Sequence, residues 1–273
     1  MAAFGRLLDV MDDLREKCPW DRKQTNQTLR PNTIEETYEL CDALLHEDRK
    51  NICKELGDVL LHVVFYAKIG SETQDFDIAD VCNQLCDKLI FRHPHVYGDV
   101  QANSAEAVLK TWEQIKQKEK DGNKTVLSGV PSALPSLIKA FRVQEKAANV
   151  GFDWEHPDDV WAKVREEYDE LQVELNALQA EKEALEAAGV DKKAPEFQEI
   201  KLRAEQEFGD LLFSLVNAGR LYKINPDNAL ERTNQKFISR FNYVEAQAKA
   251  QGKLLKDLTL AEMDRLWNEA KHQ

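Results

Sequence analysis

A pattern of four acidic residues occurs twice in this 273-residue chain. Each copy has two glutamates three positions apart, followed by a Glu-x-Gly-Asp segment that runs into apolar sequence. Residues three or four apart share one face of a helix, so the carboxylates stack and repel one another. Near a core this repulsion needs a cation, and carboxylate oxygens suit Mg²⁺, with Mn²⁺ as the alternative ion. The two predicted ligand sets are Glu36, Glu39, Glu55 and Asp58, and Glu167, Glu170, Glu207 and Asp210.

A purely structural interpretation of these acids competes with the metal site. The chain is 32% charged, so acidic pairs on helices also arise by chance, and Thr33-x-x-Glu36 fits a helix capping box. The glycine before the aspartate in both copies, Gly57 and Gly209, favours the metal site. Glycine costs about 1 kcal/mol inside a helix. Its recurrence predicts that another element or a ligand approaches closely at this point.

Composition limits the classes of partner. The net charge is −12, which disfavours binding to nucleic-acid polymers because their affinity comes from clustered Lys and Arg. The five cysteines include no Cys-x-x-Cys, which indicates reduced thiols and a cytoplasmic protein. No N-terminal signal is visible, and the longest apolar stretch, Val59–Ala67, is too short to span a bilayer. No membrane association is expected.

Amphipathic runs predict an all-α protein with two domains. Between them, Asp121–Pro135 is rich in Gly and Pro and is the predicted linker, at 121–135, with a short extended piece at Val126–Leu127. The domains are then 1–120 and 136–273, and the second carries an insertion near 176–195 that we interpret as a helical hairpin turning at Gly189. The predicted helices are Phe4–Glu16, Ile34–Leu45, Ile52–Ile69, Ile78–Phe91, Ala105–Lys118, Leu137–Ala148, Val160–Gln179, Phe197–Leu221, Pro226–Gly252 and Leu260–Lys271.

A basic pair follows the acids in each copy of the repeat. Lys236 and Arg240 are one helical turn apart, as are Lys88 and Arg92, so both members of a pair reach one phosphate group. A solvated face paired with neighbouring glutamates is the alternative. Trp267 either stacks on a nucleobase or fills a core. Acids for a metal, bases for phosphates and an aromatic ring together indicate a metal–nucleotide site.

The order of the longer motifs resembles a known family. CPWD, ELGD, RHPHVYGD, GVPSALP, GFDW, EFGDLLF and NQKFISRF, with two Glu-Glu-x-x-Glu segments, resemble the tandem-domain MazG-type nucleoside triphosphate pyrophosphohydrolases over almost the whole chain. The resemblance implies two tandem all-α NTP pyrophosphatase helical-bundle domains in a homodimer. It also implies Mg²⁺-dependent hydrolysis of NTP or dNTP to NMP or dNMP and pyrophosphate, in control of the nucleotide pool. The nucleotide-holding residues it implies are Lys163, Arg203, Lys236, Arg240 and Trp267.

The resemblance places triphosphate hydrolysis in the second domain. There a metal-activated water would attack the α-phosphorus, with Glu166 as the candidate general base. The first domain retains every acid, but Pro94 should end its helix just beyond Arg92 and weaken its hold on phosphate. We therefore expect Asp210 to be essential for hydrolysis and Asp58 to be dispensable.

Three other functions fit parts of the pattern. A dUTP or phosphoribosyl-ATP pyrophosphohydrolase shares the chemistry but not the tandem layout. A ferritin-like di-iron protein requires Glu-x-x-His, whereas both copies have Glu-x-x-Asp, and His62 of the first copy is Ser214 in the second. A non-catalytic acidic scaffold is the third. The two histidines around Pro94 are interpreted as a turn, because such a pair is a poor chelate for Zn²⁺.

Overall fold

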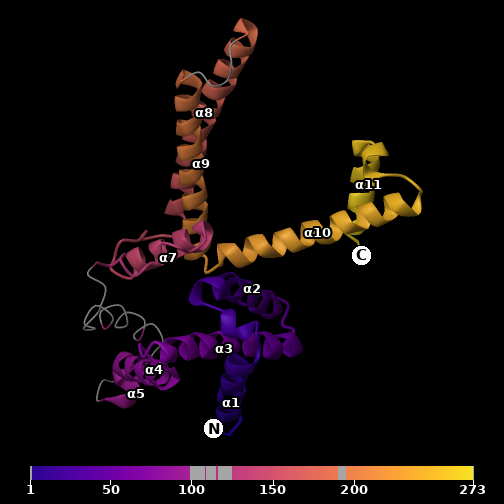
Figure 1. The fold of residues 1–273 in the computed structure, drawn as a ribbon. Helices are drawn as coiled ribbons and strands as arrows, with labels where there is room; N and C mark the ends of the chain where they lie inside the picture. Colours follow the sequence, from indigo (N-terminus) through magenta and orange to yellow (C-terminus); the bar gives the residue numbers. More distant parts are fainter. Residues whose placement is uncertain (1, 99–107, 109–114, 116–124, 190–194, 273) are drawn as a thin grey trace. The chain divides into compact units, whose positions relative to one another are not determined.

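The protein consists of helices arranged in two compact units. The computed structural model describes residues 2–98, 108, 115, 125–189 and 195–272 (Figure 1). The units are Met1–Ile115 and Lys116–Gln273. All regular structure in these ranges is helical, which confirms the predicted all-α class with two tandem helical domains. The predicted linker at 121–135 stays a prediction, since residues 116–124 lie outside the described ranges, as does most of the predicted helix at Ala105–Lys118.

The first unit is built on two long helices that pack along each other. Its elements are α1 (Ala2–Lys17), the 3₁₀ turn η1 (Asp21–Lys23), α2 (Asn26–Leu45), α3 (Arg49–Glu72), α4 (Ile78–Arg92) and α5 (Pro94–Tyr97). The core consists of Met11 from α1, Leu29 from α2, and Val64 and Phe65 from α3. As predicted, the helix carrying the first basic pair ends at Arg92, one residue before a helical turn that opens with Pro94.

Helix α2 begins earlier than the sequence predicted. Its N-cap is Thr25, whose hydroxyl accepts from the Thr28 amide at 3.2 Å, while the Thr28 hydroxyl accepts from the Thr25 amide at 2.8 Å. Thr33 lies inside the helix, where its hydroxyl donates to the Leu29 carbonyl at 3.1 Å. The alternative of a capping box at Thr33 and Glu36 is therefore wrong, and Glu36 is a mid-helix residue.

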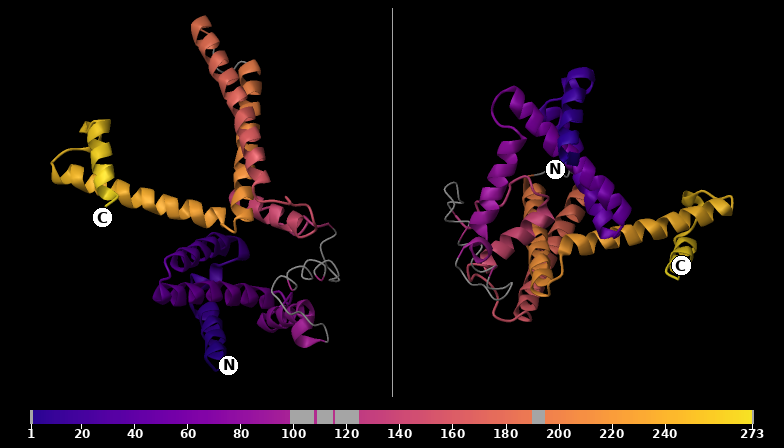
Figure 2. Two further views of the ribbon diagram at one scale, coloured as in Figure 1. Left: turned by 180° about the vertical axis from the view of Figure 1, so that it is seen from behind. Right: turned by 90° about the horizontal axis from the view of Figure 1, so that it is seen from below.

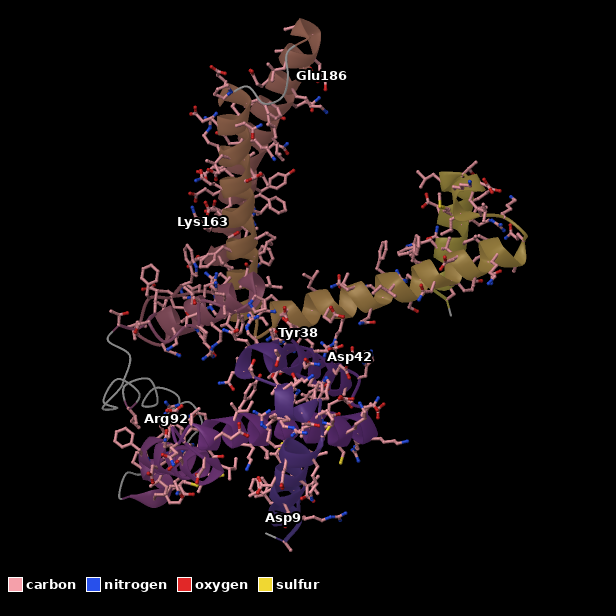
Figure 3. All side chains as sticks on the ribbon, in the orientation of Figure 1. Asp9, Tyr38, Asp42, Arg92, Lys163 and Glu186 are labelled. Atoms are coloured by element: carbon pink, nitrogen blue, oxygen red, sulfur yellow. The ribbon has the colours of Figure 1, made fainter. Side chains whose placement is uncertain are left out.

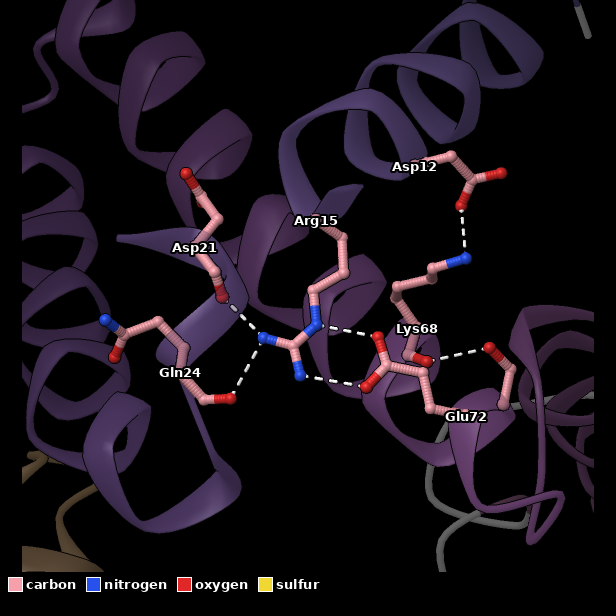
Figure 4. Close-up of polar contacts among 7 residues, drawn as sticks. Asp12, Arg15, Asp21, Gln24, Lys68 and Glu72 are labelled. Atoms are coloured by element: carbon pink, nitrogen blue, oxygen red, sulfur yellow. Dashed lines mark hydrogen bonds and ion pairs between the residues drawn. The ribbon is translucent and has the colours of Figure 1, made fainter. Parts of the chain in front are cut away.

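Arg15 ties the segment before α2 to α3. Its guanidinium donates two hydrogen bonds to the Glu72 carboxylate, at 2.7 and 2.9 Å, and further bonds to the carbonyl of Gln24, at 3.0 Å, and to that of Asp21 (Figure 4). Such bidentate pairs are geometrically specific. The guanidinium also lies 5.7 Å from the centroid of the Phe65 ring. Arg15 thus fixes the loop that leads into the first acidic helix.

A long helical hairpin dominates the second unit (Figures 1 and 2). Its elements are α7 (Ser136–Ala148), α8 (Asp159–Ala188), α9 (Pro195–Leu221), α10 (Pro226–Ala250), the 3₁₀ turn η2 (Leu255–Asp257) and α11 (Leu260–Ala270). Residues 176–188 lengthen α8, because this segment is rich in strong helix formers, and the turn at Gly189 lies at the far end of the α8–α9 hairpin. Gly189 ends α8 with φ of 67°, as a helix C-terminal glycine does.

The segment before α7 contains turns and not the predicted extended piece. The amide of Ser128 donates to the Thr125 carbonyl at 3.3 Å, and that of Val130 donates to the Leu127 carbonyl at 3.0 Å. These local bonds fold Val126–Leu127 into consecutive turns, so the extended interpretation is wrong.

Helices α10 and α11 form an arm that leaves the base of the hairpin. Helix α10 starts next to the end of α9 and runs away from the hairpin, and α11 folds back onto its far end (Figures 1 and 2). A separate small core joins the two helices of the arm, made of Val244, Ala248, Leu258 and Leu266. Within the described ranges, no helix combines the length and the apolar character needed to cross a membrane.

Candidate functional site

The structure brings three of the four predicted metal ligands together in each unit. In the first unit they are Glu36 from α2 with Glu55 and Asp58 from α3; in the second they are Glu167 from α8 with Glu207 and Asp210 from α9. In each group, one carboxylate oxygen of every residue lies within 4.8 Å of the others. All donors are carboxylate oxygens, the ligands that hard divalent cations prefer.

The fourth predicted ligand of each set lies outside the three-residue group. Glu39 follows Glu36 by one turn on α2, and its charge helps to raise the pKa of Glu36. Glu170 stands in the same relation to Glu167 on α8, and its charge helps to raise the pKa of Glu207. In the structure both acids act electrostatically on their cluster, and their role as metal ligands stays a prediction.

Mutual repulsion and burial raise the pKa of one glutamate in each cluster. For Glu36, partial burial is the largest cause, followed by the charges of Asp58, Glu39 and Glu55. For Glu207, burial again comes first, followed by Glu170, Asp210 and Glu167. A raised carboxyl pKa means that the ionised form is disfavoured, and a bound cation reverses that preference.

A lysine beside each cluster supplies part of the missing positive charge. In the first unit Lys54 Nζ lies 2.8 Å from Glu55 Oε1 and 3.6 Å from Asp58 Oδ2. In the second, Lys163 Nζ lies 2.7 Å from Glu166 Oε1 and 2.7 Å from Glu167 Oε1, on the α8–α9 hairpin (Figure 3). These hydrogen bonds raise the pKa of Lys163.

One carboxylate oxygen of the first cluster is left without a partner. Glu55 is 5% exposed, and its Oε2 is buried with no hydrogen bond, whereas Oε1 is held by Lys54. A buried charged oxygen without a partner is costly. The donor set and this oxygen both fit a divalent cation at the cluster.

The glycines next to the aspartates face open space. A Cβ built at Gly57 or at Gly209 would meet no atom within 4 Å. The predicted close approach of another element is therefore not found among the described residues. A ligand at these glycines remains the prediction.

The structure separates the predicted nucleotide-holding residues into two groups. Lys163 lies at the second acid cluster, whereas Arg203, also on the hairpin, pairs with Glu174 at 3.1 Å and with Glu199 at 3.2 Å. The other three, Lys236, Arg240 and Trp267, lie on the arm.

On the arm, the Arg240 guanidinium lies 5.7 Å from the centroid of the Trp267 ring. The centroid of the Phe237 ring lies 5.0 Å from that of the Trp267 ring. Trp267 is half-buried and also contacts the core of the arm, so it fills part of that core as well. Among the ion pairs and ring contacts of the described residues, none joins Lys236, Arg240 or Trp267 to the acids of the hairpin.

A cavity beside the second acid cluster was missed by sequence reasoning. It measures about 680 Å³ and reaches from Lys163, Glu167 and Asp210 to the apolar and aromatic side chains of α7 and α9. The sequence signal for this cavity is a small side chain where the first repeat has a large one, such as Ser214 in place of His62.

Comparison with known proteins identifies the family. Residues 24–97 match the MazG nucleotide pyrophosphohydrolase domain. The chain is 39% identical to the nucleoside triphosphate pyrophosphohydrolase of Escherichia coli (strain K12), over 100% of this chain and 98% of that protein. It is 40% identical to the nucleoside triphosphate pyrophosphohydrolase/pyrophosphatase MazG of Thermotoga maritima, over 98% and 95%. It is also 44% identical to the uncharacterized protein YabN of Bacillus subtilis, over 98% of this chain and 51% of that protein.

The all-α fold, the two carboxylate clusters and the named activities of these relatives together identify the chain as a phosphoanhydride hydrolase. The chain belongs to the MazG family of nucleoside triphosphate pyrophosphohydrolases. It is an enzyme, a hydrolase acting on phosphorus-containing acid anhydrides.

The repulsion among the acids of the second cluster predicts that Glu207 destabilises the metal-free protein at high pH. Because its pKa is raised in the folded protein, the stability that this group contributes is present at low pH and is lost as pH rises through that pKa. Glu207→Gln should therefore raise the melting temperature of the metal-free protein at pH 8, and the gain should shrink toward pH 5. Mg²⁺ should stabilise the wild type more than the variant.

Thermal unfolding in EDTA and in Mg²⁺ measures both effects. Glu205→Gln is the matched control, since Glu205 is exposed and pairs only with Lys201, at 3.5 Å, among the ion pairs of the described chain. The control should show neither the gain nor a smaller response to Mg²⁺. A metal-free Glu207→Gln protein less stable than the wild type would contradict the prediction.

Proposed function

We propose that the protein is an Mg²⁺-dependent enzyme that hydrolyses NTP and dNTP to NMP or dNMP and pyrophosphate, with Mn²⁺ as an alternative ion. The observation that carries the proposal is the convergence of Glu167, Glu207 and Asp210 within 4.8 Å, with Lys163 beside them. The named activities of full-length relatives at 39–40% identity support the substrate class. The first cluster, with Glu36, would hold the same ion.

Each residue of the second site has a proposed task. Glu167, Glu207 and Asp210 would hold the ion, with Glu170 contributing further negative charge. When bound, the ion would lower the pKa of a water that attacks the α-phosphorus and would offset the charge of the leaving pyrophosphate. Glu166 is half-exposed beside Lys163 and is the proposed proton acceptor.

Lys163 would change partners when substrate binds. In the structure the Lys163 ammonium is paired with the Glu166 and Glu167 carboxylates. Both carboxylates would turn toward a bound cation instead. The Lys163 ammonium would then pair with a phosphate group of the substrate. In this arrangement the cation neutralises the carboxylates and the lysine neutralises the phosphate. Arg203 would need to leave Glu174 or Glu199 to make a similar contact.

We further propose a homodimer in which the arm of one copy completes the site of the other. Lys236, Arg240 and Trp267 lie on an arm that runs away from its own hairpin (Figure 1). The arm leaves Phe237 and Ile238 more than half exposed, an apolar face that a second copy would cover.

The setting of this activity is also a proposal. All five cysteines are free thiols, in keeping with a reducing cytoplasm. The net charge of −12 opposes nucleic-acid polymers, but a nucleotide bound through a cation is compatible with it. We place the enzyme in the cytoplasm, where it would control the nucleotide pool.

The first products of ATP hydrolysis should be AMP and pyrophosphate. Attack at the α-phosphorus releases the β- and γ-phosphates together, so no ADP should precede AMP. Ion-exchange chromatography of early time points measures this, with an EDTA-treated sample as the control. If ADP and orthophosphate are the first products, the γ-phosphate is removed instead, and the proposed attack at the α-phosphorus is wrong.

The two acid clusters should differ in importance. Asp210→Asn or Glu170→Gln should lower pyrophosphate release by about a hundredfold or more, the scale seen when one electrostatic contact to a transition state is removed. Asp58→Asn should leave most activity intact. Circular dichroism and light scattering check that fold and assembly are retained. If Asp58→Asn is as damaging in an intact dimer, the division of labour is wrong.

Mixing two inactive variants should restore activity if arms act across the dimer. Asp210→Asn damages the acid cluster and Arg240→Ala the arm, so a mixed dimer has one site with both parts intact. Random exchange in a two-fold dimer would then give roughly a quarter of wild-type activity.

Mixing Asp210→Asn with Glu170→Gln is the control for this experiment. Both changes damage the same half of the site, so no activity should return. An Asp210→Asn and Arg240→Ala mixture that also stays inactive after subunit exchange would show that each arm serves its own chain.

A further inference from the structure

A lysine of the first unit contacts two of the three carboxylates of its acid cluster. Lys54 is on α3, and its Nζ lies 2.8 Å from Glu55 Oε1 and 3.6 Å from Asp58 Oδ2. Both acids belong, with Glu36, to the group whose carboxylate oxygens lie within 4.8 Å of one another. In the metal-free protein the ammonium therefore holds the same two carboxylates that a divalent cation would hold.

Lys54 is the charged partner of a buried acid. The Glu55 side chain is 7% exposed, whereas the Lys54 side chain is 61% exposed, so the lysine reaches from the surface to a carboxylate that has little contact with water. Glu55 Oε1 accepts a hydrogen bond from Lys54 Nζ at 2.8 Å, and Oε2 has no hydrogen-bond partner. Without the ammonium this buried carboxylate would lose its cationic partner, which is costly.

The second cluster has its lysine at a different position of the repeat. Matching the two Glu-x-Gly-Asp segments pairs Lys54 of α3 with Gln206 of α9. Matching the two Glu-Glu-x-x-Glu segments pairs Lys163 of α8 with Asn32 of α2. The two repeats thus share their acids but not the place of the lysine. In the second unit the residue before the Glu-x-Gly-Asp segment carries no charge.

The two lysines also differ in the partners that a bound cation would leave them. Lys163 Nζ contacts Glu167, which belongs to its cluster, and Glu166, which does not, each at 2.7 Å. Before substrate binds, a cation can take Glu167 and leave Glu166 to the lysine. Both ion-pair partners of Lys54 among the described residues belong to its own cluster. A cation at the first cluster therefore takes both partners of Lys54.

A divalent cation at the first cluster would also be repelled by the Lys54 ammonium. Mg²⁺ lies about 2.1 Å from its ligand oxygens, so an ion on Glu55 and Asp58 would be roughly 5 Å from Lys54 Nζ. A doubly and a singly charged cation at that separation repel each other even in water, although salt and the exposure of the lysine weaken the repulsion. If the lysine swings away instead, it gives up both ion pairs.

We propose that Lys54 is a built-in counter-cation of the first acid cluster, which competes with Mg²⁺ there and makes this cluster the weaker of the two divalent-cation sites. As the Mg²⁺ concentration rises, the second cluster fills before the first. The lysine also compensates the acids of the first unit while no metal is bound. This inference rests on the proposed binding of a divalent cation at both clusters, and it assigns to Lys54 a role in the order in which they fill.

Titration of the full-length protein with Mn²⁺ alone tests the order of filling without relying on turnover. The electron paramagnetic resonance signal of free Mn²⁺ gives the number of bound ions and their dissociation constants. The wild type should show a tighter and a weaker class of site. Asp210→Asn should remove the tighter class and Asp58→Asn the weaker one. Equal affinity at the two clusters, or the reverse assignment, would overturn the inference.

Exchanging the residues of the two repeats at the position of Lys54 tests its role directly. Lys54→Gln should tighten the weaker class by about fivefold, because a repulsion acting over roughly 5 Å is removed, and should leave the tighter class unchanged. Gln206→Lys should weaken the tighter class by a similar factor.

Lys50→Gln is the matched control for these exchanges. Lys50 is exposed and lies one turn before Lys54 on α3, so the same charge is removed from the same helix without touching the cluster. The control should change neither class. If Lys54→Gln leaves the weaker class as it is in the wild type, or acts no differently from Lys50→Gln, the role of Lys54 is refuted.

Thermal unfolding supplies a second readout. In EDTA, Lys54→Gln should melt at a lower temperature than the wild type, because the buried Glu55 carboxylate loses its charged partner. Mg²⁺ should then raise the melting temperature of this variant more than that of the wild type. Lys50→Gln should show neither effect. A Lys54→Gln protein as stable as the wild type in EDTA would contradict the proposal.

Hydrogen exchange on the wild type keeps the test decisive if the variants do not fold. Stepwise addition of Mn²⁺ should slow amide exchange around Glu207 in α9 at a lower concentration than around Glu55 in α3. The reverse order, or slowing of both segments at one concentration, refutes the inference and leaves the proposed function standing. If Mn²⁺ binds at neither cluster, the proposed metal-dependent function fails together with this inference.

Discussion

Repulsion among carboxylates held by two packed helices is the constraint on which both units depend. Helix geometry places the acids on one face, and helix packing prevents them from separating. The chain relieves the repulsion only in part, with Lys54 in one unit and Lys163 in the other. The raised pKa values of Glu36 and Glu207 and the unpartnered Glu55 oxygen show what is left uncompensated. A divalent cation would complement this geometry.

The helices resist the repulsion because their other faces are anchored. In the first unit, Arg15 of α1 forms an ion pair with Glu72 at the end of α3. In the second, Arg220 of α9 forms an ion pair with Asp153 in the segment before α8. Both pairs tie the tryptophan-containing segment of their repeat to the second acidic helix. The guanidinium comes from different helices in the two units, so the repeat preserves the link without preserving the residue that makes it.

Local features were predictable from the sequence, and features that depend on distant packing were not. The sequence spacing correctly placed Glu36 and Glu39 on one helix, and the glycine at position 189 correctly marked the end of a helix. The start of α2 was missed because Thr25 and Thr28 form the cap and Pro31 is tolerated inside the first turns. The direction of the arm was not predictable, because the sequence of α10 does not specify which element packs against its apolar face.

The cavity shows why two similar acid clusters in one chain need not share a substrate. The position of a carboxylate on a helix depends on sequence spacing, which the two repeats share and which side-chain volume leaves unaffected. The space next to the acids depends on volume at positions such as Ser214 and His62, one turn beyond the aspartate. Changes at those positions alter the space beside the carboxylates without moving the carboxylates along the helix. Two units with the same acids therefore differ first in the space next to those acids.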